Sequence, residues 1–330
     1  MTNPGSRPSS EGRGEPGAVG VIDCGTNSTR LLVVDAQGET LTRRMEITRL
    51  GQGVAASGRL APEAVQRTIA VLLGYRRLMD DLGVGRVRIT ATSAARDADN
   101  SEDFFGAAEA AIGRLPELLT GDEEGQLSFT GATADLDAHL GPFLVADIGG
   151  GSTELAAGPS HEPGAGRFSL AGVRSLDVGC VRLTETYLRS DPPKPDQVEA
   201  ARAAVNALVA GALEDIPALE RPATFIGLAG TVSALTRLHQ KLEVYDRDRV
   251  HHAWLGRNAV DHLLATLAAE TVEQRRRRAG MEIERADVIV GGAIVVSELM
   301  ALVGAERCLV SESDILDGLA MSLLELPPAP

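Results

Sequence analysis

Aromatic residues and cysteines are both scarce, and each shortage limits what the protein can do. Aromatic side chains make up 3% of the 330 residues, which argues against a surface that binds nucleic acid by stacking on its bases. The three cysteines, Cys24, Cys180 and Cys308, form neither a CxxC pair nor a zinc-binding pattern. We therefore expect reduced thiols in the core of a cytoplasmic protein.

Positive charge and long apolar runs are scarce as well. The 32 Lys and Arg residues are outnumbered by 46 Asp and Glu residues, for a net charge of −14, so the overall field does not attract nucleic acid. A polyanion would have to bind locally, through main-chain amides, a few arginines and a cation. Residues 288–304 form an apolar run of about 17 residues, shorter than the roughly 20 needed to span a membrane, and Glu298 interrupts it. We expect neither a nucleic-acid nor a membrane partner.

The order of predicted elements is typical of an α/β fold. Residues 1–17 lack the apolar segment of a signal peptide and are expected to form a flexible tail. Apolar spacing then predicts strands at 18–24, 29–36, 86–92, 142–148 and 154–158, with a further strand within 39–50. The same analysis predicts helices at 62–82, 101–112, 195–214, 230–241, 257–267 and 285–301. Strands near 223–228 and 308–310 and a final helix from Asp314 complete the pattern.

The chain contains an internal repeat with a period of about 124 residues. The segments VIDCGTNSTRLLV and VADIGGGSTELAA each consist of a strand that ends in Asp, a turn of Gly and small polar residues, and a second strand. Two copies of one unit predict two similar domains that face each other. We place the first domain at residues 18–140 and the second at 141–330, and we expect the final helix to pack back on the first domain.

An Asp followed by a Gly-rich polar turn is suited to binding phosphate. Glycine lets the backbone approach a ligand closely, and successive main-chain N–H groups form a nest for an anion. Asp23 and Asp147 are candidate ligands of Mg²⁺, with Mn²⁺ as an alternative, because a cation can bridge a carboxylate and a phosphate. Either turn alone is more typical of an ordinary hairpin; the repeat favours a phosphate site. The candidate phosphate contacts are Gly25, Thr26, Asn27, Ser28, Gly149, Gly150, Gly151, Ser152 and Thr153.

These turns resemble the phosphate loops of the superfamily of actin, sugar kinases and heat-shock chaperones. Within it, the sequence is similar to the exopolyphosphatase and guanosine pentaphosphate phosphohydrolase family, from about Ala18 to Gly318. Seven segments follow that family's order: VIDCGTNSTRLLV, ATSAARDADN, TGDEEGQLSF, DIGGGSTEL, LDVGCVRLTETYL, GLAGTVSAL and RADVIVGGAIV. The resemblance implies two ribonuclease-H-like (actin-like) domains with a cleft between them, Mg²⁺ dependence and release of phosphate. Many members carry a further helical region that this sequence lacks.

The resemblance assigns two glutamates to the chemistry. Glu124, in TGDEEG, would act as the catalytic base or orient the attacking water, because transfer of a terminal phosphoryl group to water needs little more than an in-line nucleophile. Glu154 would support the cation or the water. The simpler alternatives are that residues 122–124 only complement a helix N-terminus, the role we give to Glu123, and that Glu154 is a solvated strand residue.

Further substrate contacts are implied by the same motifs. Arg96 would hold a phosphate with two hydrogen bonds, and Gly230 and Thr231 would offer the N-terminus of a helix to another phosphate. The alternatives are a surface ion pair of Arg96 with Asp97 or Asp99, and an ordinary capped turn at 230–231.

The sequence thus predicts a phosphoanhydride hydrolase that removes terminal phosphates from inorganic polyphosphate. The alternative substrate is guanosine pentaphosphate, which presents the same bond to the same residues, and other nucleotides are further candidate ligands. A sugar kinase is disfavoured because no sugar-binding segment is evident, and an actin-like ATPase differs in requiring ATP. A homodimer is compatible with the sequence.

Overall fold

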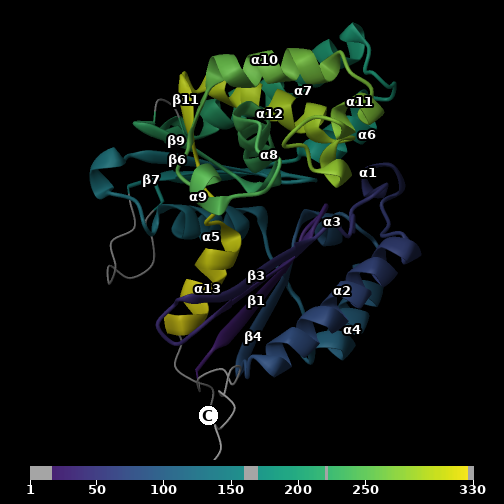
Figure 1. The fold of residues 1–330 in the computed structure, drawn as a ribbon, viewed down its shortest axis with the longest axis vertical. Helices are drawn as coiled ribbons and strands as arrows, with labels where there is room; N and C mark the ends of the chain where they lie inside the picture. Colours follow the sequence, from purple (N-terminus) through teal and green to yellow (C-terminus); the bar gives the residue numbers. More distant parts are fainter. Residues whose placement is uncertain (1–16, 160–169, 220–221, 326–330) are drawn as a thin grey trace, which may run out of the picture.

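The computed structural model describes residues 17–159, 170–219 and 222–325, so residues 1–16 of the expected flexible tail lie outside the described residues. Two mixed β-sheets lie one above the other in the view of Figure 1, each with helices on its outer side. The α/β fold class predicted from the sequence is confirmed.

The first sheet has five strands in the order β3-β2-β1-β4-β5. Strand β1 is antiparallel to β2 and parallel to β4, and β3 and β5 form the edges. The strands are β1 (Val19–Cys24), β2 (Thr29–Val34), β3 (Thr40–Glu46), β4 (Arg86–Ala91) and β5 (Glu117–Leu118). The helices on this side are α1 (Val54–Ser57), α2 (Pro62–Asp81), α3 (Ser93–Arg96) and α4 (Ser101–Ile112).

The second sheet repeats this order as β8-β7-β6-β9-β11 and adds β10 beside β11. Its strands are β6 (Phe143–Ile148), β7 (Thr153–Gly158), β8 (Gly172–Leu176), β9 (Thr224–Leu228), β10 (Trp254–Gly256) and β11 (Arg307–Val310). Its helices are α6 (Cys180–Tyr187), α7 (Pro195–Asp215), α8 (Ala229–Gln240), α9 (Arg247–Val250), α10 (Arg257–Ala268), α11 (Val272–Arg276) and α12 (Ile289–Leu302). The sequence analysis did not predict β8, β10 or α6. Among the described helices, none is long and apolar enough to cross a membrane.

Side-chain alternation decides which face of its sheet each repeated aspartate occupies. In β1, Ile22 packs with α2 and α4 on the outer face, whereas Val21 packs with the C-terminal helix on the inner face. Asp23 alternates with Ile22 and therefore lies on the inner face. In β6, Val145 packs on the inner face against α5, so Asp147 lies on that face too. Each aspartate is thus the last inner-facing side chain of its strand, at the edge where the two sheets approach each other.

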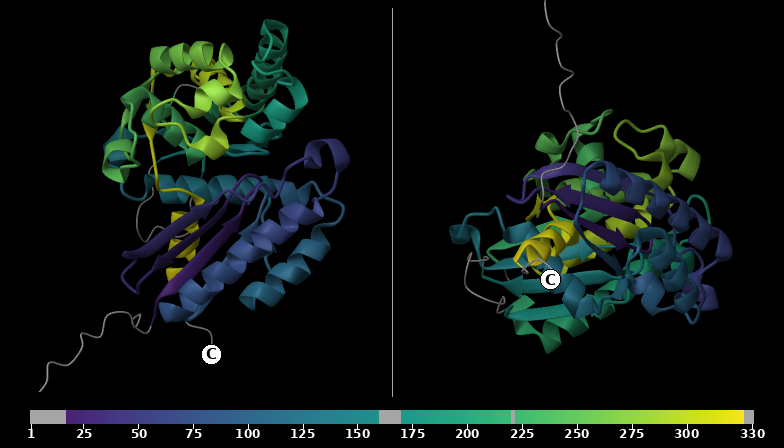
Figure 2. Two further views of the ribbon diagram at one scale, coloured as in Figure 1. Left: turned by 45° about the vertical axis from the view of Figure 1, so that its right-hand side comes forward. Right: turned by 90° about the horizontal axis from the view of Figure 1, so that it is seen from below.

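Two helices cross from one sheet to the other. Helix α5 (Gly121–Thr133) follows β5 but packs on β6, β7 and β8, and α13 (Ile315–Glu325) follows β11 but packs on β1, β2 and α5 (Figure 2). The crossing is tight, because a Cβ added at Gly131 would lie 2.0 Å from the main-chain oxygen of Asp314. The domain boundary near residue 140 stays a prediction, since each sheet is covered by a helix from the other side of that boundary.

Candidate active site

The two repeated turns have the same main-chain structure. In the first, the N–H of Gly25 donates to the carbonyl of Ser28 at 3.0 Å; in the second, the N–H of Gly149 donates to the carbonyl of Ser152 at 3.1 Å. Each turn joins two antiparallel strands directly after the aspartate. The repeat seen in the sequence therefore extends to equivalent hydrogen bonds.

The turns also lie against each other. A Cβ added at Gly150 would lie 3.0 Å from the Cβ of Thr26 and 3.2 Å from that of Asn27, and one at Gly151 would lie 2.8 Å from the hydroxyl of Thr26. Glycine is thus needed for this close approach. Within the described part of the chain, the N–H groups of Thr26, Asn27 and Gly150 donate to no acceptor. They are available to an anionic ligand.

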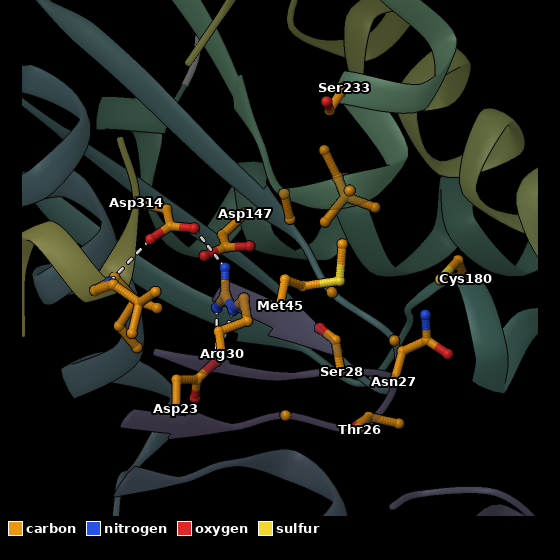
Figure 3. A pocket seen from close by; sticks show the side chains of 18 of the residues that line it. Asp23, Thr26, Asn27, Ser28, Arg30, Met45, Asp147, Cys180, Ser233 and Asp314 are labelled. Carbon is orange, nitrogen blue, oxygen red and sulfur yellow. Dashed lines mark hydrogen bonds and ion pairs between the residues drawn. The ribbon is translucent and has the colours of Figure 1, made fainter. Parts of the chain in front are cut away.

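A cavity of about 510 Å³ opens beside the turns (Figure 3). It lies between the inner faces of the two sheets and reaches the start of α8. The predicted site residues that line it are Asp23, Gly25, Thr26, Asn27, Ser28, Glu124, Asp147, Gly149, Gly150, Ser152, Glu154 and Gly230. The structure therefore brings both aspartates and both glutamates to one cavity.

Asp23 is paired with an arginine on the neighbouring strand. Arg30 is its register partner in β2, and the guanidinium donates to Oδ2 of Asp23 from Nη2 at 2.6 Å and from Nε at 3.1 Å. The other carboxylate oxygen, Oδ1, is buried and has no hydrogen-bond partner among the described residues. Burial raises the pKa of Asp23, and the Arg30 charge opposes that rise.

Asp147 occupies the equivalent position in the second sheet. The hydroxyl of Ser128 donates to Oδ2 of Asp147 at 2.7 Å. Burial, opposed by Arg30 and reinforced by the neighbouring Glu154 charge, raises the pKa of Asp147 to about 7. Burial therefore favours the protonated form of Asp147 unless a further positive charge is present.

The two aspartates suit a divalent cation. Oδ1 of Asp23 is buried without a hydrogen-bond partner among the described residues, and burial, reinforced by the Glu154 charge, disfavours the ionised form of Asp147 in the absence of a cation. Both ligands are carboxylate oxygens, the donors that hard divalent cations prefer. Arg30 lies between the two carboxylates in Figure 3 and already neutralises part of their charge.

Glu124 and Glu154 form a pair of buried carboxyl groups, 4% and 5% exposed. Glu124 lies in the first turn of α5. The capping box of that helix uses Thr120 and Glu123, which fits the helix N-terminal role expected of Glu123. Glu154 is the register partner of Asp147 and accepts a hydrogen bond from Ser175 at 2.8 Å. Burial, and after it repulsion by Glu154, raises the pKa of Glu124 well above its usual value. Such a carboxylate is a stronger base toward water than an exposed glutamate.

Four predicted contacts do not line the cavity. Arg96 donates instead to the carbonyl of Leu119 at 2.6 Å and to Oε1 of Glu124 at 3.2 Å, so it holds the glutamate from behind. Neither Asp97 nor Asp99 is its partner; Asp97 pairs with Arg182.

The other three are Gly151 and Thr153, in or beside the second turn, and Thr231, in the first turn of α8. The hydroxyl of Thr153 donates to the carbonyl of Val178 at 2.6 Å, and Thr231 packs under Gly292 of α12. Gly151 lies on the far side of its turn, where its carbonyl accepts a hydrogen bond from Arg182 at 2.7 Å. Their role here is to shape the turns and the start of α8.

The sequence analysis missed several charged residues of the cavity. For Arg30 a signal existed, because Arg30 follows Asp23 by seven residues just as Glu154 follows Asp147. For Asp314 there was none, since only the path of α13 brings it to the cavity. The cavity is also lined by Arg43, Arg44, Arg237, Arg247, Arg285, Glu282 and Glu312.

Comparison with known proteins identifies the chain's relatives. The model of the Ppx/GppA phosphatase family matches residues 21–326. The chain belongs to this family. Exopolyphosphatase 2 of Mycobacterium tuberculosis is 44% identical over 321 residues, which cover 92% of this chain and 98% of that protein. The alignment thus spans nearly the whole length of this relative.

Solved structures agree with this assignment. An exopolyphosphatase-like protein superposes with a TM-score of 0.86 at 34% identity, covering 93% of this chain and 98% of the other. An exopolyphosphatase from Cytophaga hutchinsonii superposes with a TM-score of 0.84 at 26% identity over the same shares of the two chains. The two-domain actin-like fold expected from the resemblance is confirmed, and Ppx/GppA enzymes generally depend on a divalent metal ion.

Proposed function

We propose that this protein is an exopolyphosphatase, which removes terminal phosphates from inorganic polyphosphate. The observation that carries the proposal is the 44% identity to Exopolyphosphatase 2 along 98% of that protein. The two phosphate turns in contact beside a buried glutamate pair support it. The three cysteines are unpaired and buried, which is in keeping with a cytoplasmic enzyme.

In the proposed reaction, the terminal phosphoryl group lies against the free N–H groups of the two turns. These amides stabilise the negative charge that the equatorial oxygens carry in the transition state. Glu124 takes a proton from the attacking water, and Arg96 holds Glu124 in place. Ser28 and Ser152 offer further donors at the same position.

We propose that Asp23 and Asp147 hold Mg²⁺, with Mn²⁺ able to take its place. Both ions favour oxygen ligands, and the candidate ligands are carboxylates. When bound, the cation neutralises phosphate charge and polarises the bond to the leaving phosphate. It would also satisfy the orphaned Oδ1 of Asp23.

The lining of the cavity favours polyphosphate over guanosine pentaphosphate. Beyond the turns, the described lining contains six arginines and one aromatic residue, Tyr245. Four of these arginines also pair with carboxylates: Arg30, Arg43, Arg237 and Arg285. A nucleobase is usually held by stacking and hydrogen bonds in a shaped pocket, whereas a phosphate chain needs only spaced positive charges. An arginine-rich wall with a single aromatic ring therefore fits a polyphosphate chain better than guanosine pentaphosphate.

The test is a phosphate-release assay on short polyphosphate, long polyphosphate, guanosine pentaphosphate and ATP, each with Mg²⁺, with Mn²⁺ and with a chelator. We expect release from polyphosphate that requires a divalent cation and no release from ATP. Faster release from guanosine pentaphosphate would assign the protein to the alternative substrate. Release from none of these substrates would overturn the proposal.

A further inference from the structure

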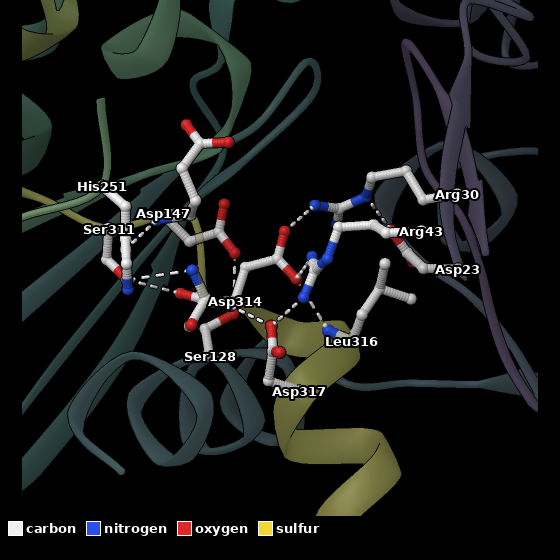
Figure 4. Close-up of polar contacts among 12 residues, drawn as sticks. Asp23, Arg30, Arg43, Ser128, Asp147, His251, Ser311, Asp314, Leu316 and Asp317 are labelled. Atoms are coloured by element: carbon white, nitrogen blue, oxygen red, sulfur yellow. Dashed lines mark hydrogen bonds and ion pairs between the residues drawn. The ribbon is translucent and has the colours of Figure 1, made fainter. Parts of the chain in front are cut away.

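The segment between β11 and α13 carries a buried carboxylate into the active-site cavity. The chain leaves the second sheet at Val310 and enters α13 at Ile315, and Asp314 lies between them, 7% exposed and in the cavity wall. Figure 4 shows Asp314 between Asp147 and the two arginines of the first sheet. No motif in the sequence singled this residue out.

Helix capping accounts for one of its oxygens. Oδ1 of Asp314 accepts the N–H of Leu316 at 2.9 Å, and the N–H of Asp314 donates to Asp317 at 2.7 Å. Helix α5 has a similar cap: the hydroxyl of Thr120 accepts the N–H of Glu123, and the side chain of Glu123 accepts the N–H of Thr120. Because a threonine hydroxyl suffices at the equivalent position of the repeat, capping does not explain why a charged group is buried here.

Arg30 explains the charge. Nη1 of Arg30 donates to Oδ2 of Asp314, while Nη2 and Nε of the same guanidinium donate to Asp23. Arg43 lies within 3.4 Å of Oδ1 of Asp314 as well. Burial acts to raise the pKa of Asp314, but the two guanidinium groups outweigh it and hold the pKa below its usual value. Asp314 is therefore an anion that forms an ion pair with Nη1 of Arg30.

The segment that carries Asp314 is itself held firmly. The N–H of Glu312 donates to Nδ1 of His251 at 3.1 Å, and the hydroxyl of Ser311 donates to the carbonyl of Ser313 at 2.8 Å. Since Nδ1 of His251 accepts this hydrogen bond, it is unprotonated, so Nε2 of the ring carries the hydrogen and donates to Asp135 at 3.2 Å. Asp135 and His251 thus form a hydrogen-bonded anchor for this segment, and the protonated Nε2 of His251 has no lone pair to offer a metal ion.

We infer that Asp314 is a positioning residue of the active site, which holds Arg30 so that the divalent cation can bind Asp23 and Asp147. This inference rests on the proposed function. Without the Asp314 charge, Arg30 would be held by Asp23 alone and would compete with the cation for that carboxylate. The cavity would also lose one negative charge. Both effects weaken cation binding, on the order of 10-fold or more for a divalent ion at these separations.

Asp314→Asn separates this role from capping. Asparagine caps a helix as well as aspartate does, so its side-chain oxygen can still accept the N–H of Leu316, but it has no charge with which to hold Arg30. Asp317→Asn is the matched control, because it removes the same charge three residues later from a side chain that contacts Arg43 and not Arg30. Mn²⁺ affinity is measured without substrate, from the electron paramagnetic resonance signal of free Mn²⁺, together with the melting temperature.

We expect Asp314→Asn to bind Mn²⁺ about 10-fold more weakly while still folded at the temperature of the titration, and Asp317→Asn to stay within about 2-fold of wild type. The melting temperature of Asp314→Asn should fall, because the ion pairs with Arg30 and Arg43 are lost. Activity of Asp314→Asn on short polyphosphate should recover at high Mn²⁺. Wild-type affinity in Asp314→Asn, or equal weakening in both variants, would overturn the inference. If Asp314→Asn does not fold, Asp314→Ser replaces it under the same criteria. A wild-type enzyme that binds Mn²⁺ but releases no phosphate would refute the proposed function and leave this test intact.

Discussion

Replacing Asp147 by asparagine should stabilise the cation-free protein while removing its activity. The wild-type carboxylate is buried beside Glu154, and its pKa is raised from 3.8 to about 7. Asparagine is neutral and nearly the same shape, and its side-chain oxygen can still accept the hydrogen bond from Ser128. The substitution therefore removes the cost of ionising a buried group and leaves the packing unchanged.

The size of the effect follows from the two pKa values. A rise from 3.8 to about 7 corresponds to about 4 kcal/mol, at about 1.36 kcal/mol for each pH unit. Entry of water and relaxation of the cavity reduce this, so we expect a gain of about 2–4 kcal/mol at pH 8. Because the folded-state pKa lies above the unfolded one, the contribution of Asp147 to stability is full below about pH 4 and is lost as the pH rises to about 7.

The gain in Asp147→Asn should therefore depend on pH. It should be larger by about 1–2 kcal/mol at pH 8 than at pH 5.5, as measured by urea denaturation in the presence of a chelator. Added Mg²⁺ should stabilise the wild type and not the variant. Asp103→Asn, an exposed change in the first turn of α4, should show no such pH dependence. A variant no more stable than wild type at pH 8 would refute the raised pKa and weaken the case for a cation site at Asp147.

Two further substitutions test the catalytic glutamate and the helix crossing. Glu124→Gln should lower kcat by about 10²–10⁴-fold with little change in KM, whereas Glu123→Gln should cost at most about 1 kcal/mol of stability. Steady-state kinetics on one defined polyphosphate tests both variants. Equal losses of kcat in the two would show that Glu124 is not the base. Gly131→Ala puts a Cβ 2.0 Å from the main-chain oxygen of Asp314, just before α13, and should destabilise the fold by about 3 kcal/mol or more. Gly106→Ala, in open space within α4, should instead stabilise it by about 0.5–1 kcal/mol in the same denaturation assay.

The repeat made much of the fold predictable. Each repeat is a strand that ends in Asp, a Gly-rich turn and a second strand, and these local features can be recognised in the sequence. Helical periodicity was also reliable: the helix predicted at residues 101–112 matches α4. Strands β8 and β10 escaped prediction because they are short and partly exposed, so their apolar pattern is weak. The path of α5 escaped prediction for a different reason: a helix's sequence shows that it has an apolar face, not which sheet that face covers. The final helix, by contrast, was expected to pack back on the first domain, and α13 contacts β1 and β2.

The candidate site divides in the same way. Asp23, Asp147 and the turns could be found because they recur at a fixed offset in the chain. The role of Arg96 could not be judged from sequence, since its distance from the cavity depends on where α5 places Glu124. Asp314 lies far along the chain from Arg30, and only the fold brings the two together.

The repeat also explains why one half of the site differs chemically from the other. The register partner of Asp23 is Arg30, whereas the register partner of Asp147, at the same place in the repeat, is Glu154. One half therefore places a positive charge beside its aspartate and the other places a second negative charge. In the proposed reaction, the first arrangement compensates the charge of a phosphate end. In the second, the negative charge of Glu154 acts together with burial to raise the pKa values of Glu124 and Asp147. Two copies of one strand–turn–strand unit can thus supply opposite halves of a hydrolytic site through a single difference in charge at one position of the repeat.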